Sequence, residues 1–379
     1  MKSFPNNKKT RKNELPDTLN ETLLPGLPDH LSQNCLTSLP PSILFSVSHA
    51  WRRLLYSSLF APFFSLYALL SASSSYPTTK DNQVDIIRSI ELMSFDPISS
   101  LWRSVPSIPK DPPLHLLHRH PSFLSRKLSV QSLTVSNHLV LISGTTHQFV
   151  PALSRPLVFH PESKKWFFGP PFTSPRRWCA TGSVHGRVYV ASGVGPRYSG
   201  EVARSMEQWD FRQQGNHWRW ENMAPLKDGR FSREPIGAIG YKGKLYMVNV
   251  KGNAPKEGLV YDVEENQWND MPRGMLAGWN GPAATMNEDA IYVVNEVTGA
   301  LSEYDCKNDC WKKVIELPEL KLAEQIAAGR GRVCVVCANG ETIVVVDVMA
   351  RPARFWVVEP PQGQQVAGLH ILPRMSGSY

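Results

Sequence analysis

The sequence predicts an all-β fold built from six repeated four-stranded units, with a small all-α segment in front of it. Two features of composition support this prediction: the 379 residues include 31 prolines and 11 tryptophans. So many prolines argue against long helices and favour short elements joined by turns. Tryptophans at regular spacing mark a repeat. A hydrophobic content of 42% is enough for a large core.

Residues 1–23 form a polar, basic tail that we expect to be disordered. Residues 1–12 hold five basic residues and no acid, so the remaining 367 residues carry only +3 of the net charge of +8. A nucleic-acid reader would carry its basic stripe on the folded part, so we expect no nucleic acid as a partner. The cluster from Lys8 to Lys12 also fits a nuclear-import signal, and we expect a cytoplasmic or nuclear location.

No secretory signal or membrane span is predicted. The first 20 residues lack an apolar core, and the longest apolar stretch, from Leu59 to Ala72, is too short for a span of about 20 residues. We therefore expect no membrane partner. The six cysteines form no compact disulfide framework, which favours free thiols in an intracellular protein.

Residues 24–64 have the pattern of short helices separated by prolines. Leu27, Leu31 and Cys35 recur every four residues and form one apolar face. Pro40 ends this segment, and apolar residues return at helical spacing between residues 44 and 55. Helices of this length are unstable alone, so the unit must bury an apolar face against something else.

These residues resemble the F-box. Its pattern occurs in order as Leu27-Pro28, Leu39-Pro40, Trp51-Arg52-Arg53-Leu54 and Phe60, although Pro41-Ser42 stands where an acidic residue is common. The resemblance implies binding to the Skp adaptor of a cullin-RING ubiquitin ligase. An ordinary helical cap on the following domain is the alternative. The expected adaptor-binding residues are Leu27, Pro28, Leu31, Leu39, Pro40, Leu44, Val47, Trp51 and Leu54.

From residue 65 to 379 one unit recurs: two apolar strands around a tight turn, a third strand ending in an aromatic-Asp pair, and then a tryptophan. The pairs are Phe95-Asp96, Phe159-His160, Trp209-Asp210, Tyr261-Asp262, Tyr304-Asp305 and Val346-Asp347. The tryptophans assigned to them are Trp102, Trp166, Trp218, Trp268, Trp311 and Trp356. The expected hairpin turns include His185-Gly186, Lys242-Gly243 and Glu288-Asp289. Four antiparallel strands per unit indicate a β-propeller of about six blades.

The unit resembles the kelch repeat, which runs about 50 residues. The Gly-Gly doublet of that family survives only as Ser143-Gly144 and Ser192-Gly193. The first unit is short at its N-terminal side, and residues 365–372 read like the opening strand of another unit. We expect this C-terminal strand to close the first blade and remove the open edges of the ring. The predicted fold is thus an all-β six-bladed kelch-like β-propeller behind a small N-terminal all-α F-box.

No catalytic or cofactor-binding motif is present, and we expect no enzyme activity, cofactor or metal. The sequence lacks a phosphate loop, a GxSxG motif and an HExxH motif. His115, His118 and His120 lie in a proline-rich loop without further ligands. Cys334 and Cys337 are three residues apart on a strand, so they point to opposite faces and cannot share one metal.

Residues that bind a target should lie in loops that break the repeat, because the repeated Trp and Tyr serve the core. In kelch propellers, one face is built from the loops that enter the first strand and those that join the second to the third. Arginine and exposed aromatic side chains anchor interfaces and suit an acidic peptide or protein. Solvated loop charge is the alternative. The candidates are Arg177, Trp178, Arg197, Tyr198, Arg233 and Trp279.

The whole chain resembles the plant F-box/kelch proteins of the Skp-interacting-partner type. This resemblance implies a non-catalytic substrate-recognition subunit of an SCF (Skp-cullin-F-box) E3 ubiquitin ligase. The F-box would bind the Skp adaptor, and the propeller would bind a target protein whose identity the sequence does not give. The alternative is a kelch scaffold, for example cytoskeletal, without a ligase role.

Overall fold

The structure is a computed structural model that describes residues 23–37, 39, 41–57, 63–72, 90–109, 130–146, 150–151, 153–197, 199–213, 218–233, 236–249 and 256–375. The chain divides into two compact units, Met1–Ala61 with Gly377–Tyr379, and Pro62–Ser376. Within the described ranges, no helix combines the length and the hydropathy needed to cross a bilayer.

The first unit contains three short helices, α1 (Asp29–Thr37), α2 (Pro41–Val47) and α3 (His49–Leu55). Helix α2 begins at Pro41, a position where the missing backbone N–H costs little. The Ser48 hydroxyl caps α3 by accepting a hydrogen bond of 3.1 Å from the Trp51 backbone N–H. The buried side chains of this unit are Leu36, Leu44, Ala50, Leu54, Leu55 and Tyr56.

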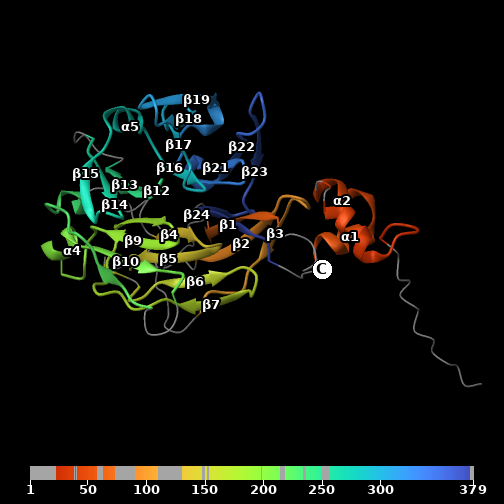
Figure 1. The fold of residues 1–379 in the computed structure, drawn as a ribbon, viewed down its shortest axis with the longest axis horizontal. Coiled ribbons are helices and arrows are strands. Elements are labelled where there is room, and N and C mark those ends of the chain that lie inside the picture. The colour runs from red at the N-terminus through yellow and green to blue at the C-terminus, as the bar shows by residue number, and fades with distance from the viewer. Residues whose placement is uncertain are drawn as a thin grey trace, which may run out of the picture. The chain divides into compact units, whose positions relative to one another are not determined.

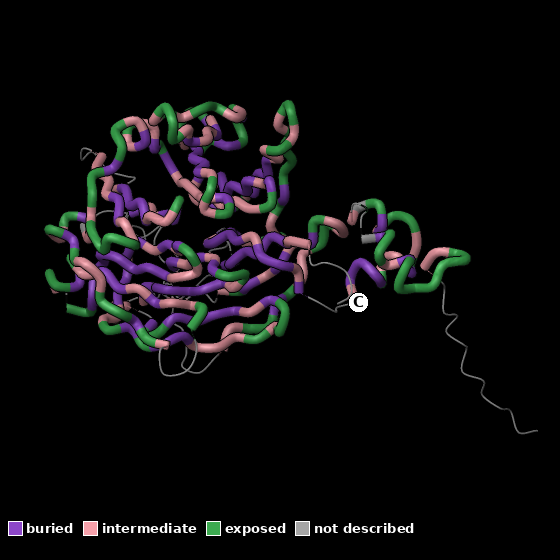
Figure 2. Tube along the Cα trace, in the orientation of Figure 1, coloured by how far each residue is buried: buried purple, intermediate pink, exposed green. Residues whose placement is uncertain are grey.

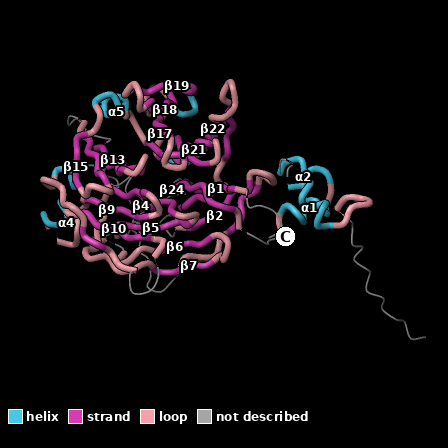
Figure 3. Tube along the Cα trace, viewed as in Figure 1, coloured by secondary structure: helices cyan, strands magenta, loops and turns pink. Residues whose placement is uncertain are grey.

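The second unit is a β-propeller of six four-stranded antiparallel blades, which confirms the predicted fold class (Figures 1 and 3). In each blade the strands are named from the inner to the outer one. Blade 1 contains β24 (Gln364–Pro373), β1 (Phe64–Ala72), β2 (Glu91–Asp96) and β3 (Leu101–Ser104). Blade 2 contains β4 (Val130–Val135), β5 (His138–Gly144), β6 (Leu157–His160) and β7 (Lys165–Phe168). Blade 3 contains β8 (Ala180–Val184), β9 (Arg187–Ala191), β10 (Met206–Asp210) and β11 (Glu221–Asn222).

The remaining blades repeat this plan. Blade 4 contains β12 (Ile236–Tyr241), β13 (Lys244–Asn249), β14 (Gly258–Asp262) and β15 (Gln267–Asp270). Blade 5 contains β16 (Ala283–Met286), β17 (Ala290–Val294), β18 (Ala300–Asp305) and β19 (Cys310–Glu316). Blade 6 contains β20 (Gln325–Gly329), β21 (Arg332–Cys337), β22 (Thr342–Asp347) and β23 (Arg354–Val358). Two short helices, α4 (Gly200–Arg204) and α5 (Arg273–Gly278), lie in the connections, with 3-10 turns at Arg230–Arg233, Pro318–Leu320 and Ala338–Gly340.

Blade 1 joins the two ends of the propeller sequence. Strand β24 pairs antiparallel with β1 from Phe64↔Pro373 to Ala72↔Gln364, with one register shift between Leu69 and Leu70. The buried Tyr67 hydroxyl also donates a hydrogen bond of 2.9 Å to the Pro373 backbone oxygen, which holds β1 and β24 together. The C-terminal strand therefore supplies the inner strand of blade 1, and the ring closes on strands from the two ends of the propeller sequence.

Six apolar clusters hold the ring together, and each is shared by two adjacent blades. Buried positions accordingly follow the inner strands, while the outer turns are exposed (Figure 2). On β21, Cys334 lies in the cluster between blades 6 and 1, and Cys337 lies in the cluster between blades 5 and 6. These two thiols therefore point to opposite faces of the strand, as the sequence predicts.

In blades 1 to 5, a repeated tryptophan links the blade to the one before it. In four blades the aromatic residue packs against the tryptophan across the strand pair, with the rings tilted and their centroids 5.0 to 5.3 Å apart. The indole N–H then donates to a backbone oxygen in the segment that leaves the preceding blade. These bonds are Trp102 to Glu359, Trp166 to Pro106, Trp220 to Pro170, Trp268 to Ala224 and Trp311 to Met275, at 2.8 to 3.0 Å.

Two of the predicted repeat tryptophans occupy different places. In blade 3 the bonding residue is Trp220 rather than Trp218, because the connection between β10 and β11 is longer than in the other blades. In blade 6 the residue opposite Val346 is Phe355, and Trp356 is 41% exposed. The hairpin turns at His185-Gly186 and Lys242-Gly243 have the positive φ angles of a tight hairpin, but the third turn is Asn287-Glu288, one residue earlier than predicted.

Candidate functional site

Among its described residues, the helical unit exposes five large apolar side chains, which are together called its apolar face: Leu27, Leu31, Leu39, Ile43 and Val47. Their exposed fractions are 41%, 44%, 37%, 45% and 54%. The last three recur every four residues, so they line one side of α2 and the turn before it. A concentration of exposed apolar side chains in so small a unit is typical of a protein-interaction surface.

Not every predicted adaptor-binding residue lies on this face. Leu44 and Leu54 are 0% and 5% exposed, so the expectation that they contact a partner directly needs correction. They belong to the interior of the unit, where they pack its helices together. Trp51 is half-buried, and its indole N–H donates a hydrogen bond of 2.7 Å to the Leu23 backbone oxygen. Pro28 is exposed, and Pro40 lies outside the described residues.

Sequence reasoning missed Ile43. Its side chain is 45% exposed between Leu39 and Val47, and the spacing of four residues on either side is the signal that could have identified it. The F-box pattern does not single out this position. The exposed face was therefore predicted in part from the family motif and could be completed only from helical periodicity.

The loops of blade 3 bring together several of the predicted target-binding residues. The segment that enters β8 pairs with the connection between β9 and β10 through two backbone hydrogen bonds. The Arg177 N–H donates to the Val194 oxygen at 3.0 Å, and the Val194 N–H donates to the Arg177 oxygen at 2.8 Å. Arg197 lies on that connection and is exposed. Trp178 is half-buried, and the Arg177 guanidinium lies 4.0 Å from the centroid of its ring.

Two of the predicted surface residues are instead buried, which corrects the expectation that they are exposed. Arg177 is 0% exposed, and its guanidinium lies over the Trp178 ring. Trp279 is 1% exposed at the end of α5, where it packs edge-on against Trp311 at a centroid distance of 6.2 Å. Tyr198 and the side chain of Arg233 lie outside the described residues. Trp178 and Arg197 are thus the candidates that the structure places at least partly at the surface.

An ion pair buried below these loops was not predicted. The Arg176 guanidinium contacts the Glu207 carboxylate, and both side chains are at most 2% exposed. Arg176 also donates to the Ser192 backbone oxygen at 3.2 Å, while Glu207 accepts from the Thr173 N–H at 3.2 Å. These bonds fix the loop entering blade 3 against β10. Hydrogen-bonded pairing of this kind is what permits charges to remain in a protein interior.

A cavity of about 410 Å³ opens beside this ion pair. Its lining includes Thr173 and Ser174 from the entering loop, Arg197 and Glu201 from the β9–β10 connection, and Glu207. Hydroxyl groups and charges of both signs therefore converge there. Such a lining offers hydrogen-bond donors and acceptors to a polar ligand.

The propeller axis contains a second cavity, of about 370 Å³, lined by the inner strands of all six blades. His370 of β24 lies there and hydrogen-bonds to the Ser132 and Thr134 hydroxyls at 2.9 and 3.2 Å. Burial lowers the pKa of His370 to about 4, so the imidazole is neutral at physiological pH. The residues that the structure describes include no cluster of three potential metal ligands. The histidines at positions 115, 118 and 120 lie outside those residues.

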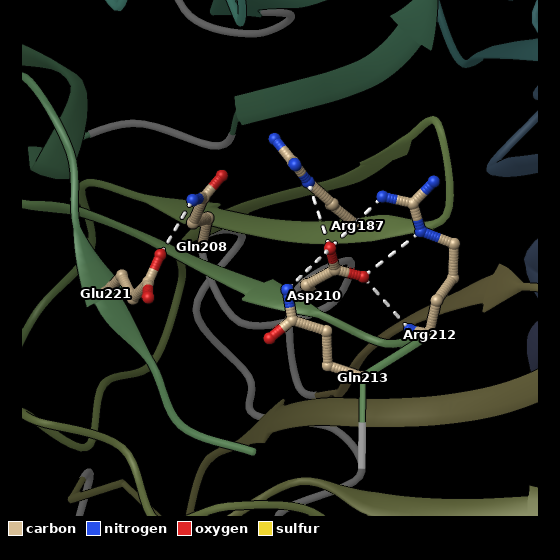
Figure 4. Close-up of polar contacts among 6 residues, drawn as sticks. All are labelled: Arg187, Gln208, Asp210, Arg212, Gln213 and Glu221. Carbon is tan, nitrogen blue, oxygen red and sulfur yellow. Dashed lines mark hydrogen bonds and ion pairs between the residues drawn. The ribbon is translucent and has the colours of Figure 1, made fainter. Parts of the chain in front are cut away.

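The repeated aspartates hold the turns of the blades. Figure 4 shows Asp210, which accepts hydrogen bonds from the Arg187 side chain at 3.3 Å and from the Arg212 backbone N–H at 3.1 Å. Hydrogen bonding from the Arg212 side chain is the main cause that lowers the pKa of Asp210. Asp262, Asp305 and Asp347 accept backbone N–H bonds in the same way. In blade 2, His160 takes this role with the Ser163 N–H at 3.2 Å.

Comparison with known proteins agrees with this architecture. No protein-family model matches the chain. The chain is 47% identical over 366 residues to the F-box/kelch-repeat protein SKIP25 of Arabidopsis thaliana, covering 94% of this chain and 91% of that protein. Two further Arabidopsis proteins are more distant: the F-box protein AFR, at 26% identity over 74% of this chain and 70% of its own length, and the F-box/kelch-repeat protein SKIP4, at 22% over 87% and 86%. Because the first similarity extends over nearly all of both chains, this protein belongs to the plant F-box/kelch-repeat family.

Proposed function

We propose that this protein is a non-catalytic substrate-recognition subunit of an SCF E3 ubiquitin ligase. The F-box binds the Skp adaptor, and the propeller binds the target protein. The observation that carries this proposal is the apolar face of Leu27, Leu31, Leu39, Ile43 and Val47, whose side chains are 37% to 54% exposed. An apolar surface of this kind gains free energy when a partner removes it from water.

The target is proposed to bind at the end of the propeller formed by the blade 3 loops. Arg197 is exposed there and lines the cavity of about 410 Å³, and Trp178 is a half-buried aromatic residue on the loop that enters the same blade. Arginine binds carboxylates and phosphates through paired hydrogen bonds, which favours a target segment with acidic character. The ligase role then needs no chemistry in this chain, because a receptor acts by raising the local concentration of a target lysine near the ubiquitin-charged enzyme.

The adaptor contact is tested by co-purification of the full-length chain with the Skp adaptor. Leu31→Asp and Val47→Asp place a charge on the apolar face without altering a buried residue. Each is expected to weaken adaptor binding by at least about 30-fold, the loss typical of an interface hot spot. Arg53→Asp, at an exposed polar position of α3, is the matched control and should bind normally. Undiminished adaptor binding by both face variants would contradict the F-box role.

The target face is tested separately, by affinity purification with the proteasome blocked. Arg197→Glu reverses the charge at the cavity and should retain the adaptor while losing target proteins. Arg219→Glu is the control, because Arg219 is 70% exposed on the approach to the outer strand of blade 3. Equal recovery of targets by both variants would exclude this face as the recognition surface. A chain that captures proteins through the propeller yet never binds the adaptor would instead be a kelch scaffold.

A further inference from the structure

An exposed thiol of blade 5 lies against the hairpin turn of blade 4, its neighbour in the ring (Figure 1). Cys306 follows directly after β18, and its Sγ lies 3.1 Å from the Nζ of Lys242, which follows directly after β12. Both residues are exposed. The contact therefore joins two nucleophilic side chains, an amine and a thiol, that are 64 residues apart in the chain.

Neighbouring cations have a different kind of partner. Lys244 Nζ lies 2.9 Å from the Asp262 carboxylate within blade 4. Lys312 Nζ lies 2.6 Å from the Asp305 carboxylate within blade 5. Each of these aspartates ends the third strand of its own blade. Lys242 instead reaches across the boundary between two blades to a sulfur atom, so its contact differs from the ion pairs that repeat within the blades.

The fold itself holds the amine and the thiol near each other. Lys242 begins the turn between β12 and β13 with a φ of 46°, and its backbone N–H donates a hydrogen bond of 2.9 Å to the Glu288 backbone oxygen of blade 5. The buried Tyr241 ring packs edge-on against Tyr304 of blade 5 at a centroid distance of 6.5 Å. The Lys242 Nζ lies 5.1 Å from the centroid of the Tyr241 ring. Contacts between the two blades therefore bring the pair together.

The surroundings of Cys306 favour the thiolate, which is the nucleophilic form of cysteine. Hydrogen bonds from the Tyr241 hydroxyl and the Lys242 amine lower the pKa of this thiol, while partial desolvation and the Asp305 carboxylate act in the opposite direction. The thiol is in turn the main cause that raises the pKa of Lys242, so the thiolate and the ammonium stabilise each other. An exposed thiolate of this kind reacts with peroxide and gives a sulfenic acid.

We propose that hydrogen peroxide crosslinks Lys242 to Cys306 and so joins blades 4 and 5 by a covalent sulfur–nitrogen bond. In the first step, the sulfur attacks one peroxide oxygen, the O–O bond breaks, and the other oxygen leaves as water after taking up a proton. The sulfur is then a sulfenic acid. In the second step, the Lys242 nitrogen attacks this electrophilic sulfur and the S–O bond breaks. The sulfenic oxygen leaves as a second water, with a proton from the amine.

The geometry of the contact favours the second step. Nitrogen and sulfur are 3.1 Å apart, which is a near-attack distance, so the amine has a high effective concentration at the sulfur. Oxidation also removes the thiolate that raises the pKa of Lys242, so the ammonium gives up its proton more readily. A thiol reductant reverses the reaction: two reductant thiols become a disulfide, and the sulfur and the nitrogen recover their hydrogens. The modification is therefore reversible.

The test is peptide mapping of the purified full-length chain by mass spectrometry, before and after treatment with hydrogen peroxide. The treated chain should yield a linked pair of peptides, one with Lys242 and the other with Cys306. The mass of this pair should be lower than the sum of the free peptides by two hydrogen atoms. Dithiothreitol should release both peptides unchanged. Cys310, an exposed thiol of the same hairpin, is the internal comparison and should not link to Lys242.

Lys242→Arg keeps a positive charge beside the thiol but replaces the amine with a guanidinium, which stays protonated. Its Cys306 should still be oxidised to a sulfenic acid, which dimedone traps, but the linked peptides should be lost. Lys244→Arg is the matched control, because this lysine pairs with Asp262, and it should crosslink like the unaltered chain. Circular dichroism checks that both variants are folded. An unaltered chain in which peroxide forms no Lys242–Cys306 link, or in which Cys306 forms a disulfide with Cys310 instead, would overturn the proposal.

Discussion

The buried indole of Trp220 in blade 3 donates a hydrogen bond of 3.0 Å to the backbone oxygen of Pro170, in the segment that leaves blade 2. Trp220→Phe keeps an aromatic ring against Trp209, whose centroid is 5.7 Å away, but removes the donor. The Pro170 oxygen then loses its partner in a buried place. We expect the free energy of unfolding to fall by about 1–3 kcal/mol, measured by denaturant unfolding.

Trp218, two residues away, is the matched control for this prediction. It also packs against Trp209, at 5.5 Å, but its buried indole nitrogen has no hydrogen-bond partner in the structure. Trp218→Phe therefore removes no hydrogen bond and should change the stability much less than Trp220→Phe does. Equal losses in the two variants would mean that ring volume, and not the link between blades, determines the effect.

Breaking the buried ion pair beside the candidate target face should be severe. Arg176→Met leaves the Glu207 carboxylate without its cation at a side-chain exposure of 2%, and we expect a loss of about 3–5 kcal/mol in the free energy of unfolding. The double variant Arg176→Met/Glu207→Gln removes both charges. It should recover a large part of the loss when unfolding is followed by circular dichroism, because no isolated charge remains buried. A double variant no more stable than Arg176→Met would show that the loop contacts matter more than the charge.

The repeat made the propeller predictable, but it did not make the loop side chains predictable. The same pattern recurs in successive blades because each blade packs against its neighbours in the same way. This pattern consists of alternating apolar residues, turn residues and aromatic pairs such as those at Tyr261 and Tyr304. The loops differ between blades, and the direction of a loop side chain depends on tertiary contacts that no local pattern encodes. Arg177 and Trp279 were therefore predicted to be exposed, although both are buried, Arg177 over the Trp178 ring and Trp279 against the Trp311 ring.

The same reasoning explains the results for the helical unit. Proline positions and helical periodicity predicted its helices, and the family motif pointed to both its surface and its interior. The motif does not separate residues that touch a partner from residues that hold the helices together, so Leu44 and Val47 were grouped, although one is buried and the other is 54% exposed. Only the packing of α2 against α3 distinguishes them.

Close approach of the inner strands makes a further prediction, at Gly240 on β12. A Cβ added there would lie 1.8 Å from the Ser183 backbone oxygen of blade 3, so Gly240→Ala must push the two inner strands apart. We expect a loss of more than about 2 kcal/mol in the free energy of unfolding, as for overpacked interiors. Gly200→Ala is the control, because no atom lies within 4 Å of the added Cβ there. Thermal unfolding of both variants checks the difference, and a stable Gly240→Ala protein would contradict the close packing of blades 3 and 4.

The buried histidine of the central cavity should make stability depend on pH. His370 has its pKa lowered from 6.5 to about 4 by burial, so between these values the unfolded chain binds a proton that the folded chain does not. Stability therefore falls as the pH drops from about 6.5 towards 4, by up to about 3 kcal/mol from this group. The pKa of His138 is lowered too, mainly by burial, and it adds to the fall in the same direction.

His370→Gln keeps a polar side chain near Ser132 and Thr134 but cannot titrate, so its stability measured by urea unfolding at several pH values should fall less steeply. Identical slopes for the variant and the unaltered chain would show that His370 is not protonated on unfolding in this range.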